Sequence, residues 1–236
     1  MKDKGGYFNR PLSYLFVSGK LDSECRERLS DYFSHIVYLR ASAELPAPVA
    51  SHADMLLFAL GDTLLSSERY LSENADLFAE IKTRSVGALG DKYPSDVLLD
   101  ALPMGKYLFC RKDATAKILL DSYEAVNVHQ GYARCSCVKI AENALITADR
   151  GIASAAYAKG VDALLISPGG VLLDGYSCGF IGGASVLLCE GKVGFFGDID
   201  THPDGLSMRE FAAKYQVELV SLGSGQLKDM GSAVAI

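Results

Sequence analysis

A histidine, several carboxylates and a pair of cysteines supply the groups that nucleophilic chemistry needs. His52 and Asp54 are separated by one residue, and Cys135 and Cys137 have the same spacing. A cysteine becomes a nucleophile when a neighbouring histidine or cation lowers the pKa of its thiol. A carboxylate beside the histidine fixes its tautomer and its orientation. The sequence therefore contains the parts of a cysteine-based active site, provided that the fold brings them together.

The elements that must position these residues recur along the chain. Each of the recurring segments has a polar start, an apolar run, a turn and a second apolar run, and they cover residues 51–65, 93–109, 133–147 and 183–196. Gly and Asn at the turns supply the backbone angles that a hairpin needs. A helix candidate follows each hairpin, and a short apolar strand ends each unit. Repeats at intervals of roughly 40–50 residues indicate an array or a propeller.

The two ends of the chain complete this pattern. Residues 14–17 and 36–39 read as strands around a helix face, so the first unit lacks only the first strand of its hairpin. Residues 231–236 supply a spare strand, and pairing it with 14–17 would hide two exposed edges. We expect an α/β fold in which five strand–strand–helix–strand units form a ring, as one domain over residues 1–236. The alternative is an ordinary open α/β sheet with antiparallel hairpins.

Composition and charge narrow the range of partners and compartments. The net charge is −6 and no cluster of Lys and Arg is present, which argues against nucleic acid. No apolar run reaches the roughly 18 residues of a membrane span. The start, Met1–Gly6, is charged and then Gly-rich, unlike a secretory signal, so we expect a cytoplasmic protein with reduced cysteines. We expect a small molecule as the partner, and the net negative charge is compatible with a cationic small molecule.

A ring of strand–strand–helix–strand units resembles the pentein superfamily over essentially the whole chain. That superfamily contains arginine and agmatine deiminases, amidinotransferases and dimethylarginine hydrolases, as well as a ribosome anti-association factor without catalysis. The local resemblance is His52-Ala53-Asp54, which opens the expected strand MLLF, because guanidine-modifying penteins carry His-x-Asp at such a strand start. Those enzymes have their nucleophilic Cys near the C-terminus, where this chain has Ser232. The fold alone does not specify the activity.

The resemblance implies that the residues at the unit entrances converge on one central cavity. In this hypothesis Cys135 attacks the carbon of a guanidinium or amidine, His52 carries the proton to the leaving amine, and Asp54 orients His52. Asp229 binds the cationic group through paired hydrogen bonds. The remaining substrate contacts are expected from Asp96, Gly183, Ser185 and Ser232.

Less specific explanations account for the same residues. His52 and Asp54 could simply cap the start of a strand, and Cys135 and Cys137 could be core residues that face one side of a strand. With His129 the two cysteines offer metal ligands, but no second pair completes a zinc site, so we predict no metal. The Gly-rich stretch 175–183 lacks the spacing of a dinucleotide fingerprint, and no segment calls for a cofactor.

Three functions remain open at this stage. The first is a Cys-dependent hydrolase or transferase that acts on a guanidino or amidino small molecule, with Cys137 or Cys178 as other choices for the reactive thiol. The second is a pentein-like ring that binds a ligand or a protein without chemistry, which the small residue Ser232 on the last strand favours. The third is a nucleotide-binding open α/β protein.

Overall fold

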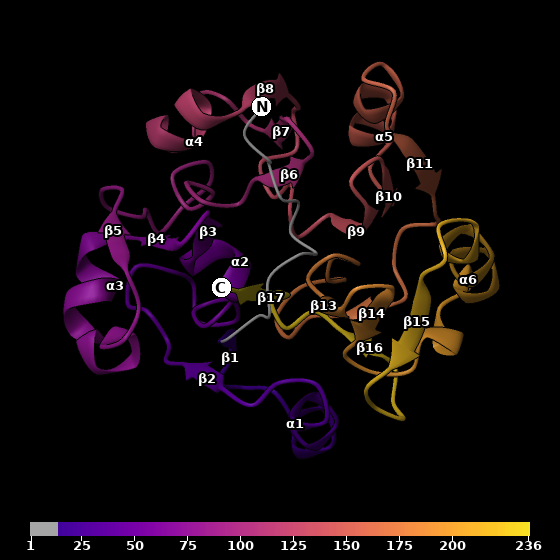
Figure 1. The fold of residues 1–236 in the computed structure, drawn as a ribbon, viewed down its shortest axis with the longest axis horizontal. Helices are drawn as coiled ribbons and strands as arrows, with labels where there is room; N and C mark the ends of the chain where they lie inside the picture. The colour runs from indigo at the N-terminus through magenta and orange to yellow at the C-terminus, as the bar shows by residue number, and fades with distance from the viewer. Residues whose placement is uncertain (1–13) are drawn as a thin grey trace.

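The computed structural model describes residues 14–236 (Figure 1). The expectation about a secretory signal at Met1–Gly6 lies outside these residues. Within them, no helix combines the length and the apolar character needed to cross a bilayer.

Small sheets with one shared topology make up most of the described chain. Within residues 14–236 there are five three-stranded sheets, and in each the middle strand pairs antiparallel with one neighbour and parallel with the other. The strands of these sheets are β17 (Ala233–Ala235), β1 (Leu15–Ser18) and β2 (Ile36–Leu39); β3 (Phe58–Leu60), β4 (Thr63–Ser66) and β5 (Thr83–Ser85); β6 (Leu102–Met104), β7 (Tyr107–Cys110) and β8 (Glu124–Asn127); β9 (Cys137–Ala141), β10 (Ala144–Thr147) and β11 (Asp162–Leu165); and β13 (Ser185–Cys189), β14 (Lys192–Phe195) and β15 (Glu218–Ser221). These separate sheets replace the alternative of one open sheet.

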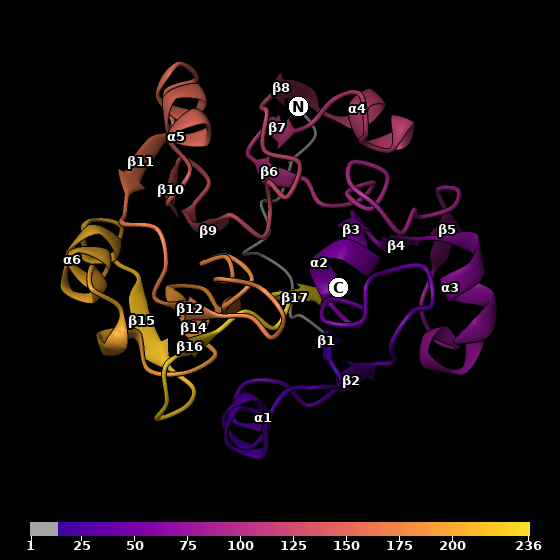
Figure 2. The ribbon, with the colours of Figure 1, turned by 180° about the vertical axis from the view of Figure 1, so that it is seen from behind.

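The helices other than α2 (Ala53–Leu56) lie outside the sheets, α2 lies on the inner side of β3, and the sheets surround a common centre (Figure 1). A sixth pairing, the parallel strands β12 (Val171–Leu172) and β16 (Leu227–Lys228), lies beside β14 and is visible from behind (Figure 2). The helices are α1 (Ser23–Ser30), α2 (Ala53–Leu56), α3 (Glu68–Glu73), α4 (Lys117–Ser122), α5 (Arg150–Tyr157) and α6 (Gly205–Lys214), with short 3₁₀ turns η1 (Ala75–Phe78) and η2 (Ile199–Thr201).

The two ends of the described chain pair with each other, as the sequence predicts. β1 and β17 run antiparallel, with Leu15 opposite Ala235 and Val17 opposite Ala233. The hairpin turns follow from their glycines: Gly61 and Gly105 have φ angles of 64° and 57°, which residues with a Cβ rarely adopt. The pairing places the start and the end of the described chain in one sheet.

The hydrophobic core is distributed between neighbouring units. Each of the five buried clusters within residues 14–236 joins side chains of two adjacent sheets. One of them joins the first sheet to the last, because Val17 of β1 packs with Val186 of β13 and with Phe196. Burial of these faces is the main stabilising contribution to the fold. It also fixes how the inner ends of the units face one another.

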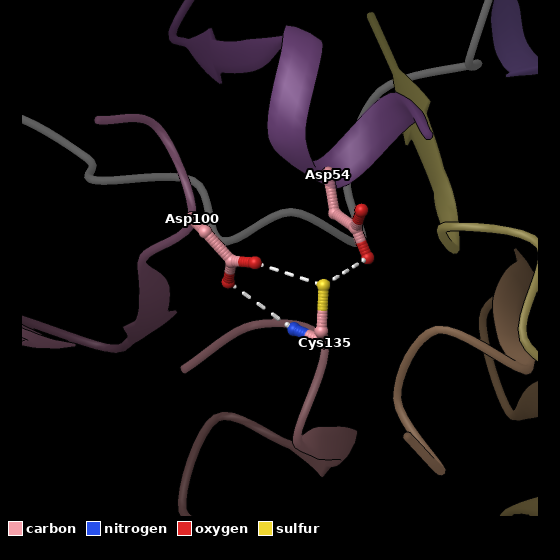
Figure 3. Close-up of side chains that lie close together, drawn as sticks. All are labelled: Asp54, Asp100 and Cys135. Carbon is pink, nitrogen blue, oxygen red and sulfur yellow. Dashed lines mark hydrogen bonds between the residues drawn. The ribbon is translucent and has the colours of Figure 1, made fainter. Parts of the chain in front are cut away.

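One local prediction is wrong. We expected His52-Ala53-Asp54 to open a strand, but residues 53–56 form the helical turn α2, and β3 begins only at Phe58. His52 is the N-cap residue of this turn, and Ala53, Asp54, Met55 and Leu56 are all buried. An apolar run that is buried on every side has no alternation that distinguishes strand from helix. The turn directs the Asp54 carboxylate toward the sulfur of Cys135 (Figure 3).

Candidate active site

The thiol of Cys135 lies between two carboxylates from two other units (Figure 3). Its Sγ donates to Oδ2 of Asp100 at 2.8 Å and is 3.0 Å from Oδ2 of Asp54. Cys135 stands two residues before β9, Asp54 is in the first turn of α2, and Asp100 stands two residues before β6. All three side chains are buried. The predicted convergence of unit entrances therefore holds for Cys135 and Asp54.

Asp100 belongs to this cluster, and the sequence analysis missed it. Its Oδ1 accepts hydrogen bonds from the backbone N–H groups of Arg134, at 2.7 Å, and of Cys135, at 3.2 Å. Asp100 thus binds both the backbone of the loop that contains Cys135 and the Cys135 thiol. A signal was present, because Asp100 interrupts the apolar run VLLDAL, and a charge in a buried run requires partners.

His52 is next to Asp229 rather than next to the thiol. Its Nδ1 is 3.7 Å from Oδ1 of Asp229, and both side chains are buried. Asp229 also accepts from the backbone N–H groups of Phe180, at 2.8 Å, and of Gly231, at 3.0 Å. Across residues 14–236, no hydrogen bond joins His52 to Asp54 or to Cys135. The carboxylate beside the histidine is therefore Asp229, whereas Asp54 contacts the thiol.

Burial and mutual repulsion control the protonation of this cluster. Burial raises the pKa of Asp54 to about 7, with a further contribution from the charge of Asp100, and burial raises the pKa of Asp100 to about 7. Burial also raises the pKa of Asp229 to about 7. The pKa of the Cys135 thiol is raised well above its usual value by burial and then by these carboxylates. Without a ligand the thiol therefore stays protonated and donates to its neighbours.

The imidazole of His52 is neutral at physiological pH. Burial lowers its pKa to about 3, and the charge of Lys20 lowers it further. A neutral imidazole can accept a proton, but it cannot offset the charge of ionised neighbours. The centre of the molecule therefore concentrates acidic groups without a cation from the histidine. Oδ1 of Asp54 also has no hydrogen-bond partner among the described residues. The positive charge of Arg134 partly offsets these acidic groups, because it lowers the pKa of Asp54 and of Asp100.

The other predicted substrate contacts occupy different places. Asp96 is buried and accepts a 2.6 Å hydrogen bond from the hydroxyl of Tyr132. Gly183 packs directly on Asp229, because a Cβ at this position would lie 2.0 Å from Oδ1 of that carboxylate. Ser185 and Ser232 do not join the acidic cluster. Their hydroxyls donate to backbone carbonyls, and both residues line a separate cavity.

The alternative thiols are placed less favourably for chemistry with this cluster. Cys137 is buried, and burial raises its pKa to about 12. Cys178 is exposed, on the Gly-rich stretch.

Asp54, Asp100 and Cys135 offer potential ligands for a metal ion, because their ligand atoms lie within 4.8 Å of one another. That set of one thiol and two carboxylates equally suits hydrogen bonds to a planar organic cation.

Two sequence comparisons bear on this chain. A family model described as a family of unknown function, DUF6873, matches residues 16–234. No curated protein matches the sequence.

Solved structures share the fold over nearly the whole chain. An amidinotransferase from Microseira wollei, of the saxitoxin biosynthetic pathway, is 9% identical with a TM-score of 0.53, covering 95% of this chain and 94% of its own. A dimethylarginine dimethylaminohydrolase from Pseudomonas aeruginosa, complexed with citrulline, is 9% identical with a TM-score of 0.55, covering 96% and 100%. C. jejuni agmatine deiminase with substrate bound is 10% identical with a TM-score of 0.56, covering 95% and 93%. At these identities the likeness extends to the fold.

Proposed function

The chain belongs to the DUF6873 family and has the pentein fold, and we propose that it is a Cys-dependent hydrolase or transferase that acts on a guanidino or amidino small molecule. The observation that carries this proposal is the position of the Cys135 thiol between the carboxylates of Asp54 and Asp100. A guanidinium is planar and offers paired N–H donors that match carboxylate oxygens. The same two carboxylates would hold its carbon against the sulfur.

A bound cation would change the protonation of the thiol. The negative charges of Asp54 and Asp100 oppose ionisation of Cys135, and a guanidinium between them neutralises those charges. The thiol pKa then falls, and its proton passes to one of the two carboxylates, whose oxygens lie within hydrogen-bond distance of the sulfur. Substrate binding is thus the step that generates the thiolate.

The chemical steps balance with water or an amine as the second reactant. The sulfur of Cys135 forms a bond to the guanidinium carbon, and one C–N bond breaks as the amine leaves with a proton. Water then attacks the S–C adduct, releasing the ureido product and restoring the thiol, or an acceptor amine takes the amidino group. We assign His52, oriented by Asp229, to relay the thiol proton from the carboxylate to the leaving amine and then to accept a proton from the attacking water, because the neutral imidazole lies on the Asp229 side of the site.

The neighbouring folds support the substrate class. Among the solved structures, the amidinotransferase, the dimethylarginine dimethylaminohydrolase and the agmatine deiminase are named for reactions of guanidino compounds. Asp96 remains our proposal for a further contact to the substrate.

We place the protein in the cytoplasm, because each cysteine of the described chain is free of disulfide bonds, which suits a reducing compartment.

A second candidate is a pentein ring that binds a ligand without chemistry. It is favoured by the state of the thiol, because burial of Cys135 and the nearby carboxylates raise the thiol pKa well above its usual value, so the sulfur stays protonated. A binding module would retain the acidic cluster for a cation and would need no thiolate.

The test is a screen of arginine, agmatine, methylarginines and amidino compounds, with mass spectrometry for ureido products, released amines and a covalent adduct on Cys135. Cys135→Ser should abolish turnover, whereas Cys137→Ser, its matched control, should retain it. Undiminished turnover by Cys135→Ser would exclude the assigned nucleophile. Saturable binding of a guanidino compound by both variants and the wild type, without product or adduct, would establish the binding module instead.

A further inference from the structure

A cavity of about 70 Å³ opens among the innermost strands of the sheets. Residues of β6, β9 and β13 line it together with Ser232, which precedes β17. A buried water needs roughly 10–15 Å³ by this measure, so the space suits a molecule of several heavy atoms. Of the described residues that form the acidic cluster around Cys135, none lines this cavity. It is therefore a second site, and its chemistry differs from that of the first.

Arg134 brings a positive charge to the wall of the cavity. Its guanidinium donates through Nη2 to the carbonyl of Ala233 at 2.7 Å. Its Nε is buried and has no hydrogen-bond partner in the part of the chain that the structure describes. A buried N–H group without an acceptor is unfavourable, and a turn of the guanidinium toward an anion in the cavity would satisfy it.

Lys139 adds a second cation to the same wall. Its Nζ is 2.7 Å from Oε1 of Glu142, and the lysine side chain is 19% exposed while that of Glu142 is 39% exposed. Arg134 is near enough for its charge to disfavour the protonated lysine, although burial is the larger cause of the lowered pKa of Lys139. Two cations of like charge on one cavity are stabilised together by an anion between them.

The rest of the wall limits the kind of anion. Leu102, Val186 and Val193 make most of it apolar. The hydroxyls of Ser185 and Ser232 already donate to backbone carbonyls, so they do not form a cage of donors. A strongly hydrated inorganic anion would lose its water without replacement on this side. A carboxylate with a short alkyl group would place its charge on the cations and its carbon atoms on the apolar wall.

We propose that this cavity binds a small aliphatic monocarboxylate, held by Arg134 and Lys139. The proposal does not rest on the function of the Cys135 site, although Arg134 also acts on that site, because its charge lowers the pKa of Asp54 and of Asp100. It adds a binding site to the inner face of the ring, between strands of neighbouring units.

The test measures binding of isobutyrate to the full chain by calorimetry at constant ionic strength. Isobutyrate should bind saturably, and isobutyramide, which has nearly the same shape without the charge, should not. Lys139→Gln should weaken isobutyrate binding about tenfold, the usual effect of losing a charge-assisted hydrogen bond. Lys106→Gln is the matched control, because Lys106 pairs with Glu124 away from the cavity and its removal should leave the affinity within about twofold.

Arg134→Lys provides a second variant, because it keeps the charge and removes Nε. It should also weaken isobutyrate binding, even if Lys139→Gln proves unstable. Equal binding of isobutyramide would contradict a carboxylate site, and so would tighter binding of sulfate than of isobutyrate. Unchanged affinity in Lys139→Gln and Arg134→Lys would place the binding elsewhere. Each of these results is read without any enzymatic turnover, so it is separate from the test of the proposed function.

Discussion

Cys135 and Asp100 contact each other twice: the Cys135 thiol is 2.8 Å from Oδ2 of Asp100, and the Cys135 backbone N–H is 3.2 Å from Oδ1 of the same carboxylate (Figure 3). One side chain therefore controls both the position of the cysteine and the field at its sulfur. Asp100 has no counterpart in the expected set of site residues. Because its carboxylate contacts the thiol directly, Asp100 is the first residue to substitute.

Asp100→Asn should lower the thiol pKa of Cys135 by at least about one pH unit. The substitution removes a negative charge beside the sulfur, while an amide oxygen can still accept from the backbone N–H groups. The measurement is the alkylation rate of Cys135 against pH, read by peptide mass. The midpoint of this profile is compared rather than the absolute rate, because the rate also depends on how easily the reagent reaches the thiol.

The exposed thiol of Cys178 serves as an internal reference in each sample. Asp113→Asn is the matched control, since Asp113 is an exposed carboxylate that pairs with Arg111, and its variant should leave the profile of Cys135 unchanged. An identical midpoint in Asp100→Asn and the wild type would show that Asp100 does not hold the thiol in its protonated form.

Asp54→Asn should stabilise the protein increasingly as the pH rises from about 4 to about 7. The pKa of Asp54 is about 7 in the folded protein against a usual value of 3.8, so the folded state binds this proton more tightly than the unfolded state does. Deprotonation of the carboxyl therefore costs stability in the wild type between those pH values, and the cost is constant above them. The variant has no such loss, so its free energy of unfolding relative to that of the wild type should increase by a few kcal/mol over this pH range.

Urea unfolding at about pH 5 and about pH 8 measures this effect as a difference between variant and wild type. The wild-type value is subtracted because His52, with its pKa lowered to about 3, changes the stability of both proteins in the opposite direction below about pH 6.5. Asp62→Asn, at an exposed position, is the control and should show no such pH dependence. A pH-independent difference for Asp54→Asn would mean that this carboxyl has an ordinary pKa.

Gly183→Ala should destabilise the protein by roughly 1–3 kcal/mol and should displace Asp229. The new methyl group would lie 2.0 Å from Oδ1 of Asp229, which is closer than any atoms can approach. Gly225→Ala is the matched control, because nothing lies within 4 Å of a Cβ there. Denaturant midpoints of both variants decide the matter, and equal stability would show that the backbone at Gly183 moves at little cost.

Tyr132→Phe should cost about 1–3 kcal/mol of stability, because it leaves the buried carboxylate of Asp96 without its 2.6 Å hydrogen bond. Tyr215→Phe removes a similar bond, of 2.7 Å to Asp162, at a half-buried position where water replaces it. That control should cost less than about 1 kcal/mol. Thermal unfolding compares the two, and an equal loss would mean that Asp96 is hydrated in the folded protein.

Much of the fold could be predicted from the sequence because it is encoded locally. Apolar runs, glycine turns and helix faces repeat along the chain, and each unit forms its own sheet from neighbouring segments. The missing first strand of the first unit indicated that 231–236 pairs with 14–17, and β1 and β17 do pair. The proposed class of chemistry came from residue types at the unit entrances together with the resemblance to the pentein superfamily, and the roles of those residues stay proposals.

The identity of the charges that meet depends on the packing between units. The sequence predicted that His52, Asp54, Cys135 and Asp229 stand at unit entrances, but entrances from different units face one another at angles set by the packing between the sheets. That packing put Asp54 and Asp100 on the thiol and Asp229 beside His52. It also put Arg134 and Lys139 on one cavity. Contacts between residues far apart in the chain depend on the relative placement of whole units, and local patterns carry no information about it.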